Sequence, residues 1–411
     1  MELTNSKKYH LKLDDYIFYL GVFFIPFDNL FFAPSEGWAT VAPIIFFFYV
    51  LCNLNFVKFN KRALKFILLL IVLSLFNYIF YPPVLSAFAD TAISLVLGIS
   101  FFLSIYIHFF VKKKKATLFL KVLFIAYLIS YFYGILSLFN ISFIDNIMSF
   151  LEKRSYDRLQ FTFTEPSFIS MHLYGVILPV IILFKEYKEK KYLIILLIIY
   201  SVTALLFCES SRFIIDTVII TVVLYIYWLI KFKCKLQYKL LSVLLLILFG
   251  LIIIIVFWRD DRIGNILSNG IYADASLAAR WFRVNAIIKG ILQNPLSILL
   301  GFGFSNTHYP FNIGYDAAYI EYSNQYLYEI ESIRNTVDPS FFCGHIRVIA
   351  DFGVLVYLYL FYMLYKHKNK NILVCVIVMY LYLQFDSYAF YTIWLYILNL
   401  LFINDNNRIK V

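Results

Sequence analysis

The residues of this sequence that could do chemistry are chiefly arginines paired with carboxylates. Arg212 and Asp216 are four residues apart, and Arg347 and Asp351 repeat that spacing. Residues four apart are neighbours on a helix, so both pairs can close as ion pairs. Either the charges simply neutralise each other, or each aspartate orients an arginine whose remaining donors face a ligand. An arginine fork grips phosphate in a planar, bidentate way that lysine cannot reproduce.

A second arginine pair, Arg280 and Arg283, lies in the segment 276–292, which is predicted to be an amphipathic helix. Residues three apart lie on one face of a helix. Capping residues before it and an Asn-Pro pair after it set its ends. The apolar positions with helical spacing are Trp281, Val284, Ile288 and Ile291. The simplest interpretation is a helix along the membrane interface with solvated arginines.

Two groups are candidates for a general base. His345 precedes Arg347 and Asp351, and histidine exchanges a proton near neutral pH. Glu165 lies in Thr164-Glu165-Pro166-Ser167, a helix start with proline in the first turn, where the carboxylate could instead be only a cap. A lone histidine at an interface is also often structural, so both roles stay open.

The elements that must position these residues are membrane helices. The chain has 411 residues, 62% hydrophobic and only 15% charged, with a mean hydropathy of +0.79. This composition excludes a soluble globular protein and predicts an all-α polytopic membrane protein. About twelve spans are predicted, at 15–32, 37–54, 63–80, 87–111, 116–140, 167–184, 192–208, 213–230, 240–257, 346–365, 371–386 and 388–403.

Lysine and arginine lie on opposite sides of the predicted membrane. The segments on the side of the N-terminus hold 23 of the 25 lysines, including Lys112 to Lys115, and the other side holds nine of the eleven arginines. Lysine excess predicts that both termini are cytoplasmic. Scattered over short loops, these lysines favour contact with membrane lipid and argue against nucleic acid, despite the net charge of +11. The arginines therefore predict an outward-facing site for an anion.

Two outer segments are long enough to build such a site within a single integral membrane domain spanning 1–411. They are 141–166, which holds Arg158 and Glu165, and 258–345, the large loop between the ninth and tenth spans. The large loop contains Gly301-Phe302-Gly303-Phe304, predicted to be a turn. It also contains a tyrosine-rich stretch from Tyr309 to Tyr328, including Tyr322, whose rings and neighbouring amides and carboxylates would suit sugars.

The depth of the charges argues against an ion-coupled transporter. Asp28, Asp90, Asp216, Asp351 and Asp386 all fall toward the outer ends of their spans, whereas coupling normally needs a charge near the bilayer midplane. No inverted repeat and no Asp-x-Asp metal motif is evident in the sequence, so neither a metal nor another cofactor is expected.

The arrangement resembles the Wzy-type O-antigen polymerases and the related O-antigen ligases, which share a GT-C-like membrane fold. The resemblance covers the whole topology, and locally the stretch RLQFTFTEPS, from Arg158 to Ser167, is similar to an element common in the polymerases. Further matches are Ser211-Arg212, Ala279-Arg280-Trp281 and His345 with Gly353 behind it. The ligases typically carry a longer glycine pattern after that histidine, so the resemblance favours a polymerase.

The resemblance implies a bacterial inner-membrane glycosyltransferase with its active site on the periplasmic face. The implied donor is a glycan on undecaprenyl pyrophosphate, transferred with inversion and without a metal to a hydroxyl of a lipid-linked repeat unit. A chain-length regulator would be a partner. Arg280 and Arg212 would hold the pyrophosphate, with Arg283, Arg158 and Arg347 as further contacts, and His345 is preferred over Glu165 as the base. The alternatives are an O-antigen ligase with a lipid A core acceptor and a polysaccharide-lipid flippase.

Overall fold

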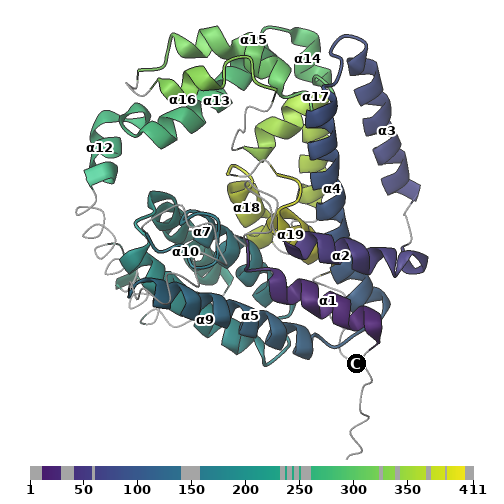
Figure 1. Cartoon of the computed structure of the whole chain (residues 1–411), viewed down its shortest axis with the longest axis vertical. Coiled ribbons are helices and arrows are strands. Elements are labelled where there is room, and N and C mark those ends of the chain that lie inside the picture. Colours follow the sequence, from purple (N-terminus) through teal and green to yellow (C-terminus); the bar gives the residue numbers. More distant parts are fainter. Residues whose placement is uncertain are drawn as a thin grey trace, which may run out of the picture.

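The computed structural model describes residues 12–28, 41–57, 61–139, 158–231, 261–323, 327–337, 343–366, 372–384 and 387–402, with positions 237, 243, 244 and 250. These residues form an all-α protein in two layers, a helical bundle below and a smaller group of helices above it (Figure 1). The predicted ninth span at 240–257, apart from positions 243, 244 and 250, and the first part of the 141–166 segment lie outside the described residues.

Five of the described helices are long and apolar enough to cross a membrane. They are Leu85–Val111 (α4 with a π-helical last turn), Ala116–Ser137 (α5), Lys190–Phe207 (α9), Ser211–Lys231 (α10) and Gly344–Met363, within α17 (Gly344–Lys366). The chain is therefore a multi-pass membrane protein. Shorter apolar helices are Val41–Leu51 (α2), Leu64–Tyr78 in α3 (Lys61–Tyr78), Phe168–Leu183 (α7, a π-helical turn and α8), Ile372–Leu381 (α18) and Tyr391–Leu401 in α19 (Tyr391–Phe402).

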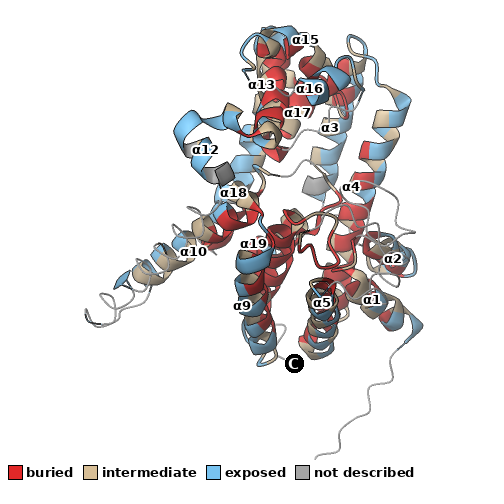
Figure 2. Ribbon diagram, turned by 60° about the vertical axis from the view of Figure 1, so that its left-hand side comes forward, coloured by how far each residue is buried: buried red, intermediate tan, exposed pale blue. Residues whose placement is uncertain are grey.

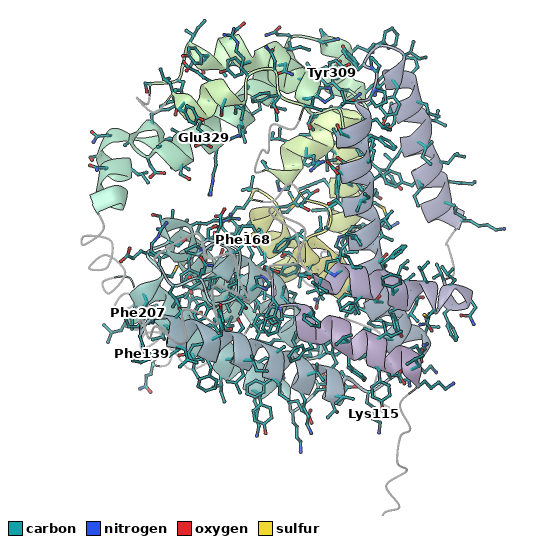
Figure 3. The ribbon with its side chains drawn as sticks, in the orientation of Figure 1. Lys115, Phe139, Phe168, Phe207, Tyr309 and Glu329 are labelled. Atoms are coloured by element: carbon teal, nitrogen blue, oxygen red, sulfur yellow. The ribbon has the colours of Figure 1, made fainter. Side chains whose placement is uncertain are left out.

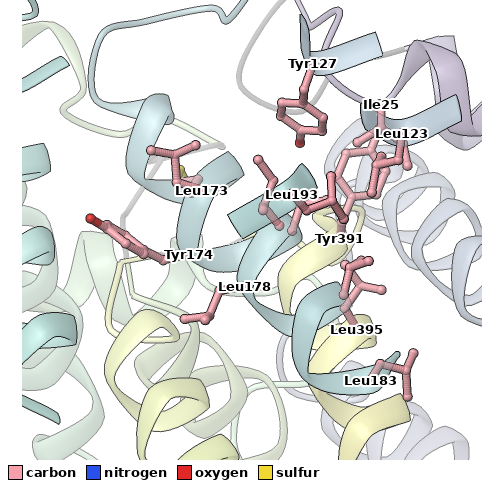
Figure 4. Packing of buried hydrophobic residues seen from close by; sticks show 14 of the residues in the cluster. Ile25, Leu123, Tyr127, Leu173, Tyr174, Leu178, Leu183, Leu193, Tyr391 and Leu395 are labelled. Atoms are coloured by element: carbon pink, nitrogen blue, oxygen red, sulfur yellow. The ribbon is translucent and has the colours of Figure 1, made fainter. Parts of the chain in front are cut away.

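A helix lies over each predicted span whose residues are described, although several are shorter than predicted. The first, α1 (Leu13–Phe24), ends just before Pro26, which offers no backbone N–H to continue a helix. The bundle packs around a core of aromatic and branched side chains, of which Tyr127, Leu173, Tyr391 and Leu395 are examples (Figure 4). Exposed apolar residues cover α3 and the outer sides of α9 and α10, as expected where helices meet lipid (Figure 2).

The large loop folds into a separate helical layer, which we call the outer subdomain. It comprises α12 (Asp261–Asn269), α13 (Ala275–Leu292), α14 (Pro295–Leu300), α15 (His308–Tyr319) and α16 (Tyr328–Ser332). The predicted amphipathic helix is α13, and Asp274 caps it by accepting a hydrogen bond from the backbone N–H of Leu277 at 2.8 Å. Asn294 caps α14 in the same way.

The buried face of α13 differs from the predicted apolar stripe. Of the four predicted positions only Ile291 is buried, and Trp281 is 39% exposed. The buried side carries Phe282 and a row of small residues, because α15 approaches α13 so closely that a Cβ on Gly290 would lie 1.8 Å from the carbonyl oxygen of Pro310. The small residues of α13 thus pack against α15, and Trp281 stays outside this contact.

The outer subdomain is tied to the bundle at a break in α17. Gly353 has φ +79° and ψ 170°, which interrupts the helix. The predicted turn at 301–304 fits against this break: the N–H of Phe302 donates to the carbonyl of Ala350 at 2.8 Å and that of Gly303 to Asp351 at 2.9 Å. Gly301 and Gly303 also have positive φ, so glycine is required on both sides of the junction.

The end of α3 and the turn that leads to α4 form a second tie to the outer subdomain. The side-chain amide of Asn77 donates to the carbonyl of Leu300 at 2.9 Å, and the hydroxyl of Tyr78 donates to that of Phe304 at 2.8 Å. Asn306 donates in turn to the backbone of Tyr81 at 2.7 Å. Together, the hydrogen bonds at the break in α17 and those at the end of α3 hold the outer subdomain, including α13, against the bundle.

Candidate functional site

A cavity of about 700 Å³ lies between the outer subdomain and the bundle. Its bundle side comes from the 158–167 segment, the start of α10 and the turn after α18, and its outer side from α12, α13 and Glu329 of α16. Figure 3 shows Glu329 and Phe168, the first residue of α7, on opposite sides of the opening between the two layers. Five predicted site residues line this cavity: Arg158, Glu165, Arg212, Asp216 and Arg280.

Arg212 and Asp216 lie in the first two turns of α10, four residues apart as predicted, but no direct hydrogen bond joins them. Arg212 Nε lies 3.9 Å from Asp216 Oδ2. Gln384, in the turn after α18, bridges them: its Oε1 accepts from Arg212 Nε at 2.7 Å and its Nε2 donates to Asp216 Oδ1 at 2.6 Å. Tyr380 also donates its hydroxyl to Asp216 Oδ1. The aspartate, only 1% exposed, is therefore held by neutral donors.

Arg280 reaches the cavity from above, in a wall that has a large apolar part and also includes Asp274, Ser276 and Glu329. The apolar part comes from Leu277 and Val284, which share the helical face of Arg280, from Trp281 next to it, and from isoleucines of α12 and the following turn. Arg280 and Glu165 both act electrostatically on Arg212, so charges from three separate segments meet here. An arginine pair beside an apolar wall suits an amphiphilic anion, whose charge and hydrocarbon need different surroundings.

The 158–167 segment places Arg158 and Glu165 at the cavity. Glu165 accepts a hydrogen bond from the hydroxyl of Ser167 at 2.8 Å, and α7 starts immediately after. Arg158 Nη1 donates to the carbonyl of Glu209 at 2.8 Å. Glu209 and Phe161 both have positive φ, 48° and 55°, conformations that cost energy for residues with a Cβ. Such strain persists where surrounding packing imposes it, and it often marks functional sites.

Buried hydrogen bonds anchor this segment to the bundle. The hydroxyl of Thr162 donates to the carbonyl of Pro26 at 2.5 Å and lies 2.6 Å from that of Ser130. Close by, His172 lies between Asp28, at 2.5 Å from Nε2, and the hydroxyl of Tyr127, at 2.8 Å from Nδ1. All these polar groups are buried, so they need such partners. The segment that carries Glu165 is thus fixed from both sides.

Arg283 is held by a carboxylate at the edge of the site. It is 6% exposed, and its Nη2 lies 2.9 Å from Glu329 Oε1. Glu329 lines the cavity, whereas Arg283 does not. The predicted role of Arg283 as a phosphate contact would therefore require it to leave Glu329.

Arg347 and Asp351 lie outside the cavity, at the junction with the outer subdomain. Arg347 Nε lies 3.9 Å from Asp351 Oδ2, the same separation as between Arg212 Nε and Asp216 Oδ2. The guanidinium stacks 4.8 Å from the ring centre of Tyr388 and donates to Thr91 at 3.0 Å, while Tyr388 donates to Asp351 at 3.1 Å. This second pair joins α4, α17 and the turn before α19.

His345 also lies away from the cavity. It is 8% exposed; its Nε2 lies 2.9 Å from the carbonyl oxygen of Met379, and its Nδ1 lies 3.1 Å from the hydroxyl of Tyr357. A carbonyl can only accept, so Nε2 carries the proton and Nδ1 accepts from the tyrosine. Both ring nitrogens are therefore bonded within the helix bundle, and the geometry favours Glu165 over His345 as a group that could reach a ligand.

Tyr322 is partly buried against the core of the outer subdomain and does not line the cavity. Its ring lies 5.7 Å from that of Phe282 and 5.8 Å from that of Tyr272. Burial, followed by the charge of Glu329, raises the pKa of its hydroxyl. Tyr315, from the same tyrosine-rich stretch, is 3% exposed in the subdomain core. These tyrosines hold the subdomain together.

Two residues of the site were missed from the sequence, Gln384 and Glu329. Gln384 is a neutral residue near the end of an apolar span, and Glu329 directly follows the tyrosine-rich stretch, beside several other acidic residues. Neither position has a motif or a spacing that links it to an arginine 172 or 46 residues away. Only the proximity of the helices reveals them.

Comparisons with known proteins return no matching family model, no matching curated protein and no matching solved structure. The function is therefore argued from the site itself.

Proposed function

We propose that the protein polymerises surface polysaccharide, transferring a glycan from undecaprenyl pyrophosphate to a sugar hydroxyl of an incoming lipid-linked repeat unit. The observation that carries the proposal is the convergence of Arg158, Arg212 and Arg280 with Glu165 on one cavity beside an apolar wall. The arginines suit the pyrophosphate, and the apolar wall suits the isoprenoid next to it.

In this proposal the arginines stabilise the leaving group. As the bond between the sugar and the pyrophosphate breaks, negative charge grows on the departing phosphate oxygens. Preorganised donors in a site shielded from water stabilise such charge most effectively. Arg280 and Arg212 take this role, with Arg158 as a further contact. No metal ion or other cofactor enters the proposed step.

Glu165 is the proposed general base, because its carboxylate lies on the cavity with these arginines. It would take the proton of the acceptor hydroxyl as that oxygen attacks the sugar from the side opposite the pyrophosphate, which gives inversion. Its bond from Ser167 orients the carboxylate. His345, bonded by Met379 and Tyr357, would support the outer end of α17.

The topology is part of the proposal: about twelve spans, both termini in the cytoplasm and the cavity on the periplasmic face of the bacterial inner membrane. Nine of the eleven arginines would then lie outside, where the lipid-linked glycan is extended. A chain-length regulator and membrane lipids are the expected partners. A ligase using the same donor is the second candidate, since the cavity would serve that donor equally well. A flippase is less favoured because it does not need a carboxylate beside the arginines.

Deletion of the gene followed by gel analysis of surface polysaccharide tests the proposal. A polymerase mutant keeps core capped by one repeat unit and loses the ladder. Loss of every capped form would refute it in favour of a ligase or a flippase. Purified protein with lipid-linked repeat unit then tests the base: Glu165→Gln should lower chain extension by about 100- to 10,000-fold, the usual contribution of a general base. If His345→Gln abolished chain extension while Glu165→Gln retained it, the general base would be His345 and not Glu165.

A further inference from the structure

The conformation of Gln384 is fixed by its place in the turn after α18. Its backbone N–H donates to the carbonyl of Leu381 at 2.9 Å, and the N–H of Leu383 donates to that of Tyr380 at 3.1 Å. The carbonyl of Gln384 accepts a second bond from Arg212, from Nη2 at 3.2 Å. Gln384 thus contacts Arg212 through both its side chain and its backbone.

The chemistry of the amide matches its two neighbours in only one orientation. Arginine has donors and no acceptor, whereas an ionised carboxylate has acceptors and no donor. The amide oxygen of Gln384 must therefore face Arg212, and its nitrogen must face Asp216, as the distances of 2.7 and 2.6 Å require. The orientation is determined by the partners on either side.

This arrangement prevents the ordinary contact between Arg212 and Asp216. An arginine and a carboxylate left together form a bidentate pair, which would use the donors along one edge of the guanidinium. Here Nε and Nη2 of Arg212 bond to Gln384, and the nearest Nε–carboxylate distance is 3.9 Å. Asp216 is stabilised by the Gln384 amide and the Tyr380 hydroxyl. Both of these bonds go to Oδ1, while Oδ2, the oxygen that lies 3.9 Å from Arg212 Nε, accepts no hydrogen bond among the described residues. The two charges therefore attract each other across a gap and are not joined by a direct hydrogen bond.

We propose that Gln384 is a positioning residue that keeps the guanidinium of Arg212 apart from Asp216 and directs its charge to a phosphate in the cavity. Gln384 lines the same cavity as Arg212 and Arg280, so it would lie beside the phosphate that Arg212 binds. This inference rests on the proposed function for the identity of the anion. It adds that a neutral amide, not the aspartate, controls how strongly Arg212 binds.

Two substitutions test this role, one that removes the amide and one that replaces it with a negative charge. Gln384→Met keeps the length of the side chain but removes both bonds, and Gln384→Glu places a carboxylate against Arg212. The probe is inorganic pyrophosphate, measured by calorimetric binding to the purified protein and as an inhibitor of chain extension. Losing one charge-assisted hydrogen bond typically weakens binding about 10- to 100-fold, and we expect this for Gln384→Met and at least as much for Gln384→Glu. Gln293→Met, on an exposed amide at the end of α13, is the matched control and should bind normally.

A double-mutant cycle separates positioning from general damage. In an Arg212→Ala background, Gln384→Met should cause no further loss of pyrophosphate binding, because the group it positions is gone. Equal losses with and without Arg212, or wild-type binding by Gln384→Glu, would overturn the inference while leaving the anion site intact. Wild-type protein that fails to bind pyrophosphate would refute the anion site and the inference together. Unchanged elution and melting of each variant serve as the folding control.

Discussion

Replacing Gly353 by alanine should release the outer subdomain from the bundle. The backbone at Gly353, with φ +79° and ψ 170°, lies in a region that residues with a Cβ enter only at a cost of about 1–3 kcal/mol. A Cβ there would also lie 2.1 Å from the carbonyl oxygen of Leu299. Backbone atoms cannot remain that close, so α14 and α17 must move apart.

The separation breaks the two hydrogen bonds that join the 301–304 turn to α17, each worth about 1 kcal/mol. Adding about 2 kcal/mol for the bonds to the strain gives a destabilisation of about 3–5 kcal/mol for the docked state. Since about 1.4 kcal/mol is a factor of ten, the closed junction becomes at least roughly 100-fold less favoured. The cavity, which lies between the two layers, should lose its shape as a result.

Hydrogen exchange measured by mass spectrometry on the intact protein in detergent or nanodiscs tests this prediction. Peptides that contain Phe302 and Gly303 should exchange about 100-fold faster in Gly353→Ala than in wild type. Gly264→Ala on α12 is the matched control, because a Cβ there meets nothing within 4 Å, and it should not change exchange at the turn. Wild-type protection in Gly353→Ala would show that the turn is not held by the break in α17, and the reasoning would fail.

Three further predictions concern charge. Arg280→Lys should lose nearly as much chain extension as Arg280→Ala, at least about 100-fold, because a point charge cannot replace the bidentate guanidinium at the leaving group. Arg334→Lys, at an exposed ion pair, is the control and should have a mild effect. Normal extension by Arg280→Lys would refute the role of Arg280 at the pyrophosphate. Burial lowers the pKa of His308 below its usual 6.5, so the unfolded chain binds the proton more readily than the folded protein. The melting temperature should therefore fall as the pH drops below about 6.5, and it should fall less steeply with pH in His308→Gln. The same pH dependence in His308→Gln would show that this histidine does not contribute. Reporter fusions should read cytoplasmic after Lys113 and periplasmic near Tyr322, and a cytoplasmic signal at Tyr322 would invalidate the site's location.

The membrane helices and one arginine–aspartate spacing were predictable because both depend on local rules. Hydropathy marked the helices, and a separation of four residues put Arg212 beside Asp216. Hydropathy could not, however, show where each helix ends, since α1 stops at Phe24 and α18 at Leu381, before the predicted limits. These ends matter, because the turn after α18 carries Gln384.

The composition of the site was less predictable because it depends on packing between distant segments. No local pattern predicts that α13 buries Arg283 and exposes Trp281, because this follows from the close packing of α15 against the small residues of α13. From the sequence His345 was preferred over Glu165 as the base; the structure places Glu165 on the cavity and bonds both ring nitrogens of His345 within the bundle. Residue type thus identified the arginines, while tertiary contacts decided which of them share a cavity.

The tie of the outer subdomain to the end of α3 and the turn after it has a consequence for biogenesis. Asn77, Tyr78 and Tyr81 bond to residues more than 220 positions later in the chain, and Ala350 of α17 completes the subdomain core. During synthesis the early helices must therefore wait in the bilayer until nearly the whole chain has emerged. The cavity also takes Leu383 and Gln384 from the turn after α18, so a chain that stops short of α17 cannot complete the site.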